Sequence, residues 1–109
     1  MLKNFTDELF ETDIAKEEIS IIQFSAQWCG PCKSLRPILD SLSSSSEYSD
    51  KNIGWYYADV EEGGINTASA MGIKGVPSTI VFSKGLEIGR LVGFPGEVKV
   101  KEFLDKYIK

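Results

Sequence analysis

The chain has 109 residues, 42% of them hydrophobic and 26% charged, which favours a single globular domain over residues 1–109. Its formal net charge is −4, so we expect no broad electrostatic attraction to nucleic acid or to an anionic membrane. No segment is apolar for long enough to span a membrane, and the first residues do not show a basic stretch followed by an apolar one. We therefore expect a cytoplasmic protein, working as a monomer.

Residues 1–17 predict a short strand followed by a helix. Thr6 is placed to cap this helix, and Asp7 and Glu8 fall in its first turn, where carboxylates are favoured. We expect the helix only to cover one face of a sheet.

Residues 18–25 predict a buried central strand, because apolar side chains occur on both of its faces and Gln23 is the exception. A helix follows from about residue 30 into the forties. Pro31 suits its first turn, whereas Pro37 inside it should bend the axis. Apolar residues recur along this helix at i, i+3, i+4 and i+7. They are Leu35, Ile38, Leu39 and Leu42.

The second half of the chain predicts a strand over residues 52–60, a short helix over residues 65–71 and a last helix from about residue 96. Between these two helices lie two antiparallel strands, residues 79–82 and 86–92, joined by a short turn. The complete order of elements is β-α-β-α-β-α-β-β-α. This order predicts an α/β domain with a mixed sheet and helices on both faces.

The two cysteines of the chain, Cys29 and Cys32, lie between the buried strand and the long helix. The first sulfur precedes the helix, where the positive end of the helix dipole favours a thiolate. Two thiols at this spacing can close and reopen a disulfide, so the pattern predicts thiol–disulfide exchange. A structural zinc site needs about four Cys or His ligands, so we expect no metal and no other cofactor. A metal shared by two chains and a buried inert pair are the alternatives.

The segment Trp28-Cys29-Gly30-Pro31-Cys32-Lys33 resembles the active site of the thioredoxin family. The resemblance covers essentially the whole chain and implies a thioredoxin fold. In that fold a central mixed five-stranded β-sheet is flanked by four α-helices, and the strand before the dithiol lies in the middle. Further landmarks follow in family order. They are Pro37, Asp59, Gly72, Val76-Pro77-Ser78-Thr79, Gly85, Gly93 and Glu102-Phe103-Leu104.

The resemblance implies a general protein-disulfide reductase with Cys29 as the nucleophile and Cys32 as the resolving thiol. The two residues between the cysteines are Gly30 and Pro31. Oxidising relatives carry a histidine there, and that histidine stabilises the thiolate. We therefore expect a reducing couple. The electron donor implied by the resemblance is an NADPH-dependent thioredoxin reductase, and the acceptors are disulfide-containing target proteins.

The resemblance also implies a peptide groove beside the dithiol. In the family the bond between the residues equivalent to Val76 and Pro77 is cis and lies against the sulfurs. The backbone of Val76 would then pair with an extended substrate. Phe94 could serve the groove or be an exposed loop aromatic. The apolar rim would consist of Trp28, Gly75, Gly93 and Phe94.

Three positions depart from the family pattern. Gln23 replaces a buried aspartate beneath the dithiol, Trp55 replaces the lysine that partners it, and Ser25 replaces a bulky aromatic residue. Glutamine cannot act as a base, so we expect Gln23 to change the rate and pH dependence of the resolving step. A neutral packing role for Gln23 is the alternative. The departures also keep open a specialised relative with one dedicated partner, or a binding subunit that does not use its dithiol.

Overall fold

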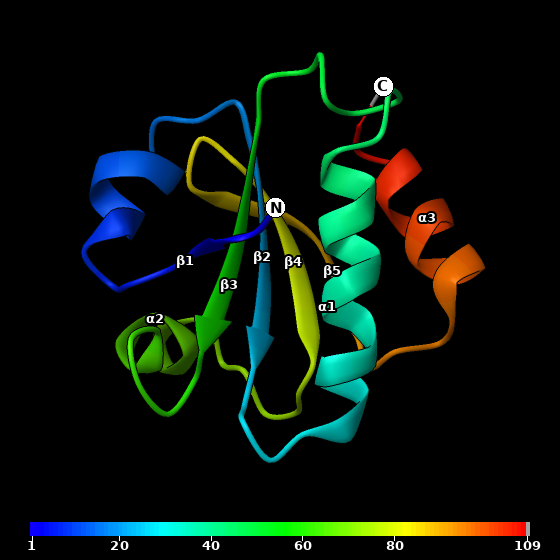
Figure 1. Cartoon of the computed structure of the whole chain (residues 1–109). Coiled ribbons are helices and arrows are strands. Elements are labelled where there is room, and N and C mark those ends of the chain that lie inside the picture. The colour runs from blue at the N-terminus through cyan, green and yellow to red at the C-terminus, as the bar shows by residue number, and fades with distance from the viewer. Residues whose placement is uncertain (109) are drawn as a thin grey trace.

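The strand predicted over residues 18–25 is the central strand of a five-stranded sheet in the computed structural model, which describes residues 1–108 (Figure 1). The sheet order is β1-β3-β2-β4-β5. The strands are β1 (Lys3–Asn4), β2 (Ile19–Ser25), β3 (Ile53–Asp59), β4 (Ser78–Ser83) and β5 (Leu86–Val92). The helical segments are η1 (Phe10–Ile14), α1 (Gly30–Ser43), α2 (Ile65–Ala70) and α3 (Glu97–Asp105).

The sheet is mixed, as the order of elements predicts. Strand β3 is parallel to both β1 and β2, whereas β4 is antiparallel to both β2 and β5. The turn between β4 and β5 places Lys84 and Gly85 at positive φ, 51° and 82°, as a tight two-residue hairpin requires. The predicted antiparallel pair is therefore confirmed.

Helices cover both faces of the sheet, with α1 and α3 on one side and η1 and α2 on the other (Figure 1). Successive residues of β2 serve the two layers in turn. Ile21 belongs to the apolar core that also contains α1 and α3, while Ile22 and Phe24 belong to the second core, with residues of η1 and α2. The prediction of a central, buried strand, made from the apolar residues on both faces of β2, is thus confirmed.

The long helix α1 forms as predicted, with Cys29 as its N-cap and Cys32 in its first turn. Pro31 lies in its first turn and Pro37 in its interior, where proline removes one helical hydrogen bond. The helix persists because its apolar side is fixed by packing: Leu35 and Leu39 are fully buried. Burial of such side chains contributes about 1.5–3 kcal/mol each, which is comparable with the cost of an interior proline.

The helix predicted near the N-terminus is much shorter than expected. It is a single π-helical turn, Phe10–Ile14, in which the Ala15 N–H donates to the Phe10 carbonyl at 2.8 Å. No side chain caps it, so the predicted capping role of Thr6 is wrong.

Asp7 caps α2 instead of its own helix. Its carboxylate accepts hydrogen bonds from the backbone N–H groups of Asn66 and Thr67 at 3.1 and 2.9 Å, and from the Thr67 hydroxyl at 2.8 Å. The residue that precedes α2 is Gly64, which has no side chain to offer. The first N–H groups of α2 are therefore satisfied from a residue nearly sixty positions away.

The other helix ends are close to those predicted. Gly72, the residue after the C-cap Met71 of α2, has φ of 67°, the left-handed conformation expected of a terminating glycine. The last helix ends at Asp105, before the end of its apolar stripe, yet Ile108 still packs into the core.

We expect Asp7→Ala to lower the free energy of unfolding by about 1–2 kcal/mol, as for the loss of a helix cap. Burial raises the pKa of Asp7, but the hydrogen bonds from Thr67 and Asn66 outweigh it and bring that pKa below its ordinary value. The stabilisation is therefore present above the unfolded pKa of about 3.9 and is lost as the pH falls through the lower folded pKa.

Urea unfolding from neutral pH down into acid measures this effect. The difference between the wild type and Asp7→Ala should shrink as the pH falls. Glu8→Ala is the matched control, because Glu8 is the adjacent carboxylate and is exposed. Equal losses from Asp7→Ala and Glu8→Ala would contradict the capping role.

Candidate active site

Cys29 and Cys32 lie where the chain leaves β2 and enters α1. Cys29 is the N-cap residue of α1, with an extended backbone (φ −88°, ψ 110°), and its sulfur accepts a hydrogen bond from the Cys32 N–H at 3.1 Å. The two residues form a disulfide with their Cα atoms 5.3 Å apart. A sulfur in this position faces the unpaired N–H groups of a helix start, which stabilise negative charge on it.

The two sulfurs differ in their access to solvent. Cys29 is 3% exposed and Cys32 is fully buried. Both pack with Ala26 in a small apolar cluster that Val60 and Val76 border. An incoming sulfur can therefore approach the Cys29 side of the pair, whereas Cys32 is reached only through it.

The loop before β4 lies against the dithiol, as the resemblance implies. The Val76–Pro77 peptide bond is cis, and Val76 borders the sulfur cluster. The Pro77 carbonyl accepts a hydrogen bond from the Gly93 N–H at 2.7 Å. Gly93 has φ of 86°, a conformation that favours glycine. The backbone thus brings the loop before β4 and the loop after β5 to the same edge of the sheet as Cys29.

The remaining predicted groove residues differ in their exposure to solvent. Trp28 is 70% exposed, and its indole N–H donates to the Glu61 carboxylate at 3.1 Å. Phe94 is partly buried and packs against the core beneath α1 and α3, so it is not a freely exposed loop aromatic. Gly30 and Pro31, between the two cysteines, and Gly75, next to Val76, are exposed.

Sequence reasoning missed the contributions of Ala26, Val60 and Glu61. Val60 follows β3 directly, and its N–H donates to the Ser25 carbonyl at 2.9 Å. Strands β2 and β3 are parallel, so their carboxyl ends meet at one edge of the sheet. That parallel pairing is the signal that could have found Val60.

Gln23 lies in the polar layer directly beneath the dithiol. Its side chain is fully buried, and its amide nitrogen donates to the Ser25 hydroxyl at 2.8 Å and to the Cys32 carbonyl at 3.1 Å. Thr79 is its partner on β4. Within residues 1–108, the Gln23 amide oxygen and the Thr79 hydroxyl are the buried side-chain polar atoms without a hydrogen-bond partner.

The sheet register shows which residues of β3 lie opposite Gln23 and Ile21. Trp55 lies opposite Ile21, and Tyr57 is the residue on β3 that lies opposite Gln23. Trp55 packs against the Tyr48 ring at 5.9 Å within the core. The Tyr57 ring lies 3.9 Å from the Arg36 guanidinium. Strand boundaries alone could not give this pairing, because a shift of two residues leaves every side chain on the same face.

Residues 1–108 contain no group of three or more His, Cys, Asp or Glu side chains arranged to hold a metal ion. No helix within the same range is long and apolar enough to cross a membrane.

A redox-active cysteine pair at the start of a helix, on an α/β sheet of this order, defines a thiol–disulfide oxidoreductase. The family model described as Thioredoxin matches residues 1–106. The chain belongs to the thioredoxin family. It is accordingly a protein-disulfide reductase, whose family implies disulfide substrates and a reductase partner.

Individual thioredoxins are similar over nearly their whole length. The chain is 36% identical over 104 residues to a thioredoxin of Buchnera aphidicola, covering 94% of this chain and 93% of the relative. It is 33% identical over 103 residues to a thioredoxin of Staphylococcus haemolyticus, covering 94% of each. These matches do not favour the alternative of a specialised relative or a binding subunit.

Solved thioredoxin structures confirm the fold. The Malassezia sympodialis thioredoxin superimposes with a TM-score of 0.88 at 25% identity, covering 100% of this chain and 92% of the other. The Plasmodium falciparum thioredoxin gives a TM-score of 0.85 at 26% identity, covering 97% and 99%. The predicted mixed five-stranded sheet with four helical segments is thus confirmed.

We expect Gln23→Asp to accelerate the resolving step by about tenfold or more near neutral pH. A carboxylate buried at this position would have a raised pKa and could take the proton that Cys32 releases. The step would also become pH-dependent. Stopped-flow tryptophan fluorescence with a model disulfide follows it in single turnovers.

The matched control is Gln23→Asn, which has the size of the aspartate without its charge. A rate that is equal in Gln23→Asp and Gln23→Asn would assign Gln23 a packing role only.

Proposed function

We propose that Cys29 is the attacking thiol and Cys32 the resolving thiol of a general protein-disulfide reductase. The observation that carries the assignment is the hydrogen bond from the Cys32 N–H to the Cys29 sulfur, at 3.1 Å. It gives Cys29, and not Cys32, the stabilisation of a helix N-terminus. Cys29 is also the less buried of the two.

The proposed reaction proceeds in two exchanges. The Cys29 thiolate attacks one sulfur of the target disulfide, which forms a mixed disulfide and releases the other target sulfur as a thiolate that takes up a proton. Cys32 then loses its proton and attacks the Cys29 sulfur, releasing the second target thiol. The target gains two electrons and two protons, and the Cys29–Cys32 disulfide holds the oxidation.

The proposed substrate groove runs beside the dithiol along the loops before β4 and after β5. Val76 borders the sulfur cluster, and the Gly93 N–H is bound to the Pro77 carbonyl, so both loops are fixed relative to Cys29. Trp28 offers an exposed ring at the other side. The proposed substrate-binding residues are Trp28, Gly30, Pro31, Gly75, Val76, Pro77, Gly93 and Phe94.

The proposed electron donor is an NADPH-dependent thioredoxin reductase, with target proteins in the cytoplasm and the chain acting as a monomer. Membership of the thioredoxin family supports a donor of this kind. Reduction of insulin disulfides, first with dithiothreitol and then with thioredoxin reductase plus NADPH, tests the activity and the donor separately. Activity with the first donor alone would reject the proposed partner and retain the dithiol chemistry.

Two single substitutions should separate the roles of the cysteines. We expect Cys32→Ser to accumulate a mixed disulfide with the target, because the second exchange is blocked. Cys29→Ser should form none and should lose essentially all insulin reduction. Mass spectrometry of the non-reduced products distinguishes the two results, and a stable adduct through Cys32 in Cys29→Ser would reverse the assignment.

The reduced Cys29 thiol should have a pKa below the ordinary cysteine value of about 8.5, because a helix N-terminus stabilises its thiolate. Iodoacetamide should therefore modify Cys29 faster at neutral pH than it modifies a free cysteine. The pH profile of the alkylation rate measures this pKa. The Cys32→Ser variant provides a control with a single reactive thiol, and a midpoint at or above that of free cysteine would contradict the proposal.

A further inference from the structure

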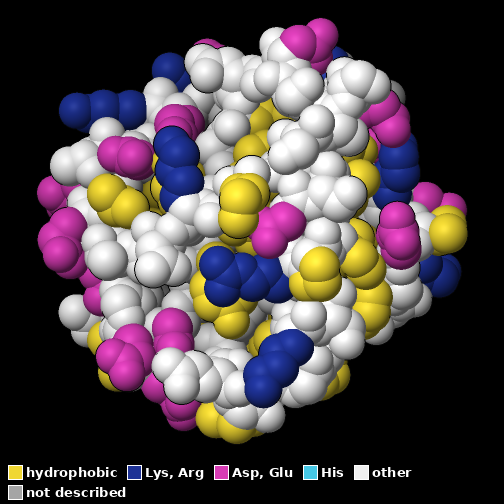
Figure 2. All heavy atoms as spheres, in the orientation of Figure 1, with side chains coloured by type: hydrophobic (Ala, Val, Ile, Leu, Met, Phe, Trp, Pro, Cys, Tyr) yellow, Lys and Arg dark blue, Asp and Glu magenta, His cyan; other side chains and the backbone are white. Residues whose placement is uncertain are grey.

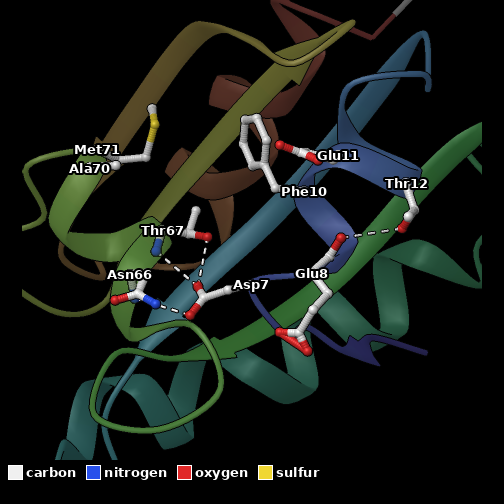
Figure 3. Close-up of a pocket in the computed structure, with 9 residues that line it drawn as sticks. All are labelled: Asp7, Glu8, Phe10, Glu11, Thr12, Asn66, Thr67, Ala70 and Met71. Atoms are coloured by element: carbon white, nitrogen blue, oxygen red, sulfur yellow. Dashed lines mark hydrogen bonds between the residues drawn. The ribbon is translucent and has the colours of Figure 1, made fainter.

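A groove between η1 and α2 is lined by none of the residues of the dithiol site. Its volume is about 660 Å³, within the range of about 300–1,000 Å³ typical of ligand pockets. Its lining residues are Asp7, Glu8, Phe10, Glu11, Thr12, Asn66, Thr67, Ala70 and Met71 (Figure 3).

Apolar side chains from both walls face the groove. Phe10 and Met71 stand on opposite sides of it in Figure 3, and both are only partly buried. The Phe10 ring is held edge-on by Phe82, with the ring centres 5.7 Å apart. Met71 is a flexible, polarisable side chain that adapts to the shape of a neighbour. An apolar side chain placed between the two would complete the packing that each lacks.

The charged residues that line the groove are all acidic, and Arg90, which donates to the Met71 carbonyl at 2.8 Å behind the groove wall, is paired with Glu87 at 2.7 Å. Glu8 and Glu11 are exposed, and neither lysine nor arginine lines the groove. Figure 2 shows acidic side chains along the left side of the molecule, where η1 and α2 lie. The Asp7 carboxylate is already occupied by α2, which leaves Glu8 and Glu11 to meet an incoming ligand. Their charge favours a cationic ligand and opposes an anionic membrane surface.

The walls of the groove are held in place before any ligand arrives. Asp7 ties the segment before η1 to α2 through three hydrogen bonds. The wall that carries Phe10 and Glu11 is a π-helical turn, a rare conformation that occurs frequently at functional sites. A preformed groove costs a ligand little ordering of the protein.

We propose that this groove, defined by Phe10, Ala70 and Met71 with the rim residues Glu8 and Glu11, docks a cationic amphipathic segment of a partner protein. One aliphatic or aromatic side chain would lie between Phe10 and Met71, and flanking Lys or Arg side chains would pair with Glu8 and Glu11. The partner would be held through a surface other than the substrate groove, whether the dithiol is reduced or oxidised. The proposal goes beyond the reductase function and does not depend on it.

The test is an NMR titration of the ¹⁵N-labelled full chain with two cysteine-free peptides. One peptide has a Leu-Phe pair flanked by lysines, and its counterpart has glutamates in place of the lysines. We expect the lysine peptide to shift the amides of residues 7–12 and 66–71 saturably, and the glutamate peptide to leave them unchanged. Equal binding of both peptides, or shifts centred on residues 29–32 and 75–77, would overturn the proposal.

Charge reversal identifies the rim. The double variant Glu8→Lys/Glu11→Lys should raise the dissociation constant of the lysine peptide at least tenfold. Glu97→Lys/Glu102→Lys is the matched control, because it changes the net charge by the same amount at exposed positions on α3. Long-range charge alone should raise the dissociation constant of the lysine peptide less than about twofold in this control. Equal weakening by the two double variants would show a net-charge effect only and overturn the site.

A neutral substitution tests the apolar part. Ala70→Trp places a large ring into the groove from an exposed position on α2 without changing the charge. It should abolish the chemical-shift changes that the lysine peptide causes. Retained binding would contradict the proposed docking site. Concentration-dependent shifts of residues 7–12 without peptide would assign the groove to a second copy of the chain, against the proposal. All variants should reduce insulin at the wild-type rate, so loss of docking and loss of reductase function are scored separately.

Discussion

The hydrogen bond between the Cys32 N–H and the Cys29 sulfur, at 3.1 Å, is the contact on which the chemistry of this protein depends. A backbone N–H can point at that sulfur only because Cys29 ends an extended segment and Cys32 lies in the first turn of α1. The central strand β2 and the apolar stripe of α1 fix the two segments relative to each other. Fold stability and thiol reactivity therefore share the same few residues.

The layer beneath the dithiol is neutral at Gln23, the position at which the family resemblance implies a buried aspartate. The Gln23 amide binds the Ser25 hydroxyl and the Cys32 carbonyl, so it fixes the first turn of α1 from inside the core. A neutral amide costs less to bury than an ionised carboxylate. Ser25 is small enough to lie in the same buried layer, next to Cys32. Gln23 and Ser25 thus form one buried polar unit, and we expect its effect to fall on the second exchange rather than on the first.

The two faces of the sheet separate two kinds of surface. The dithiol belongs to the helix on one face, and the acidic groove belongs to η1 and α2 on the other (Figure 1). Asp7 connects the segment before η1 to α2, because its carboxylate accepts the hydrogen bond from the Thr67 N–H at the start of that helix. Asp7 also lines the groove. A partner held there would leave the substrate groove at the dithiol open. The fold can in this way present a reactive site and a docking surface at once.

The amino-acid sequence alone predicts the order of strands and helices, the central position of β2, the start of α1 at the dithiol and the chemistry of the two cysteines. These features depend on neighbouring residues and on the periodicity of apolar side chains, or on a motif whose residues are adjacent in the chain. Three features became visible in the folded chain alone: Tyr57 lies opposite Gln23 in the sheet register, Asp7 caps α2, and residues 10–14 form a π-helical turn. Asp7 and Thr67 are sixty positions apart, and local pattern carries no information about contacts of that kind, because they form only when the sheet brings distant segments together.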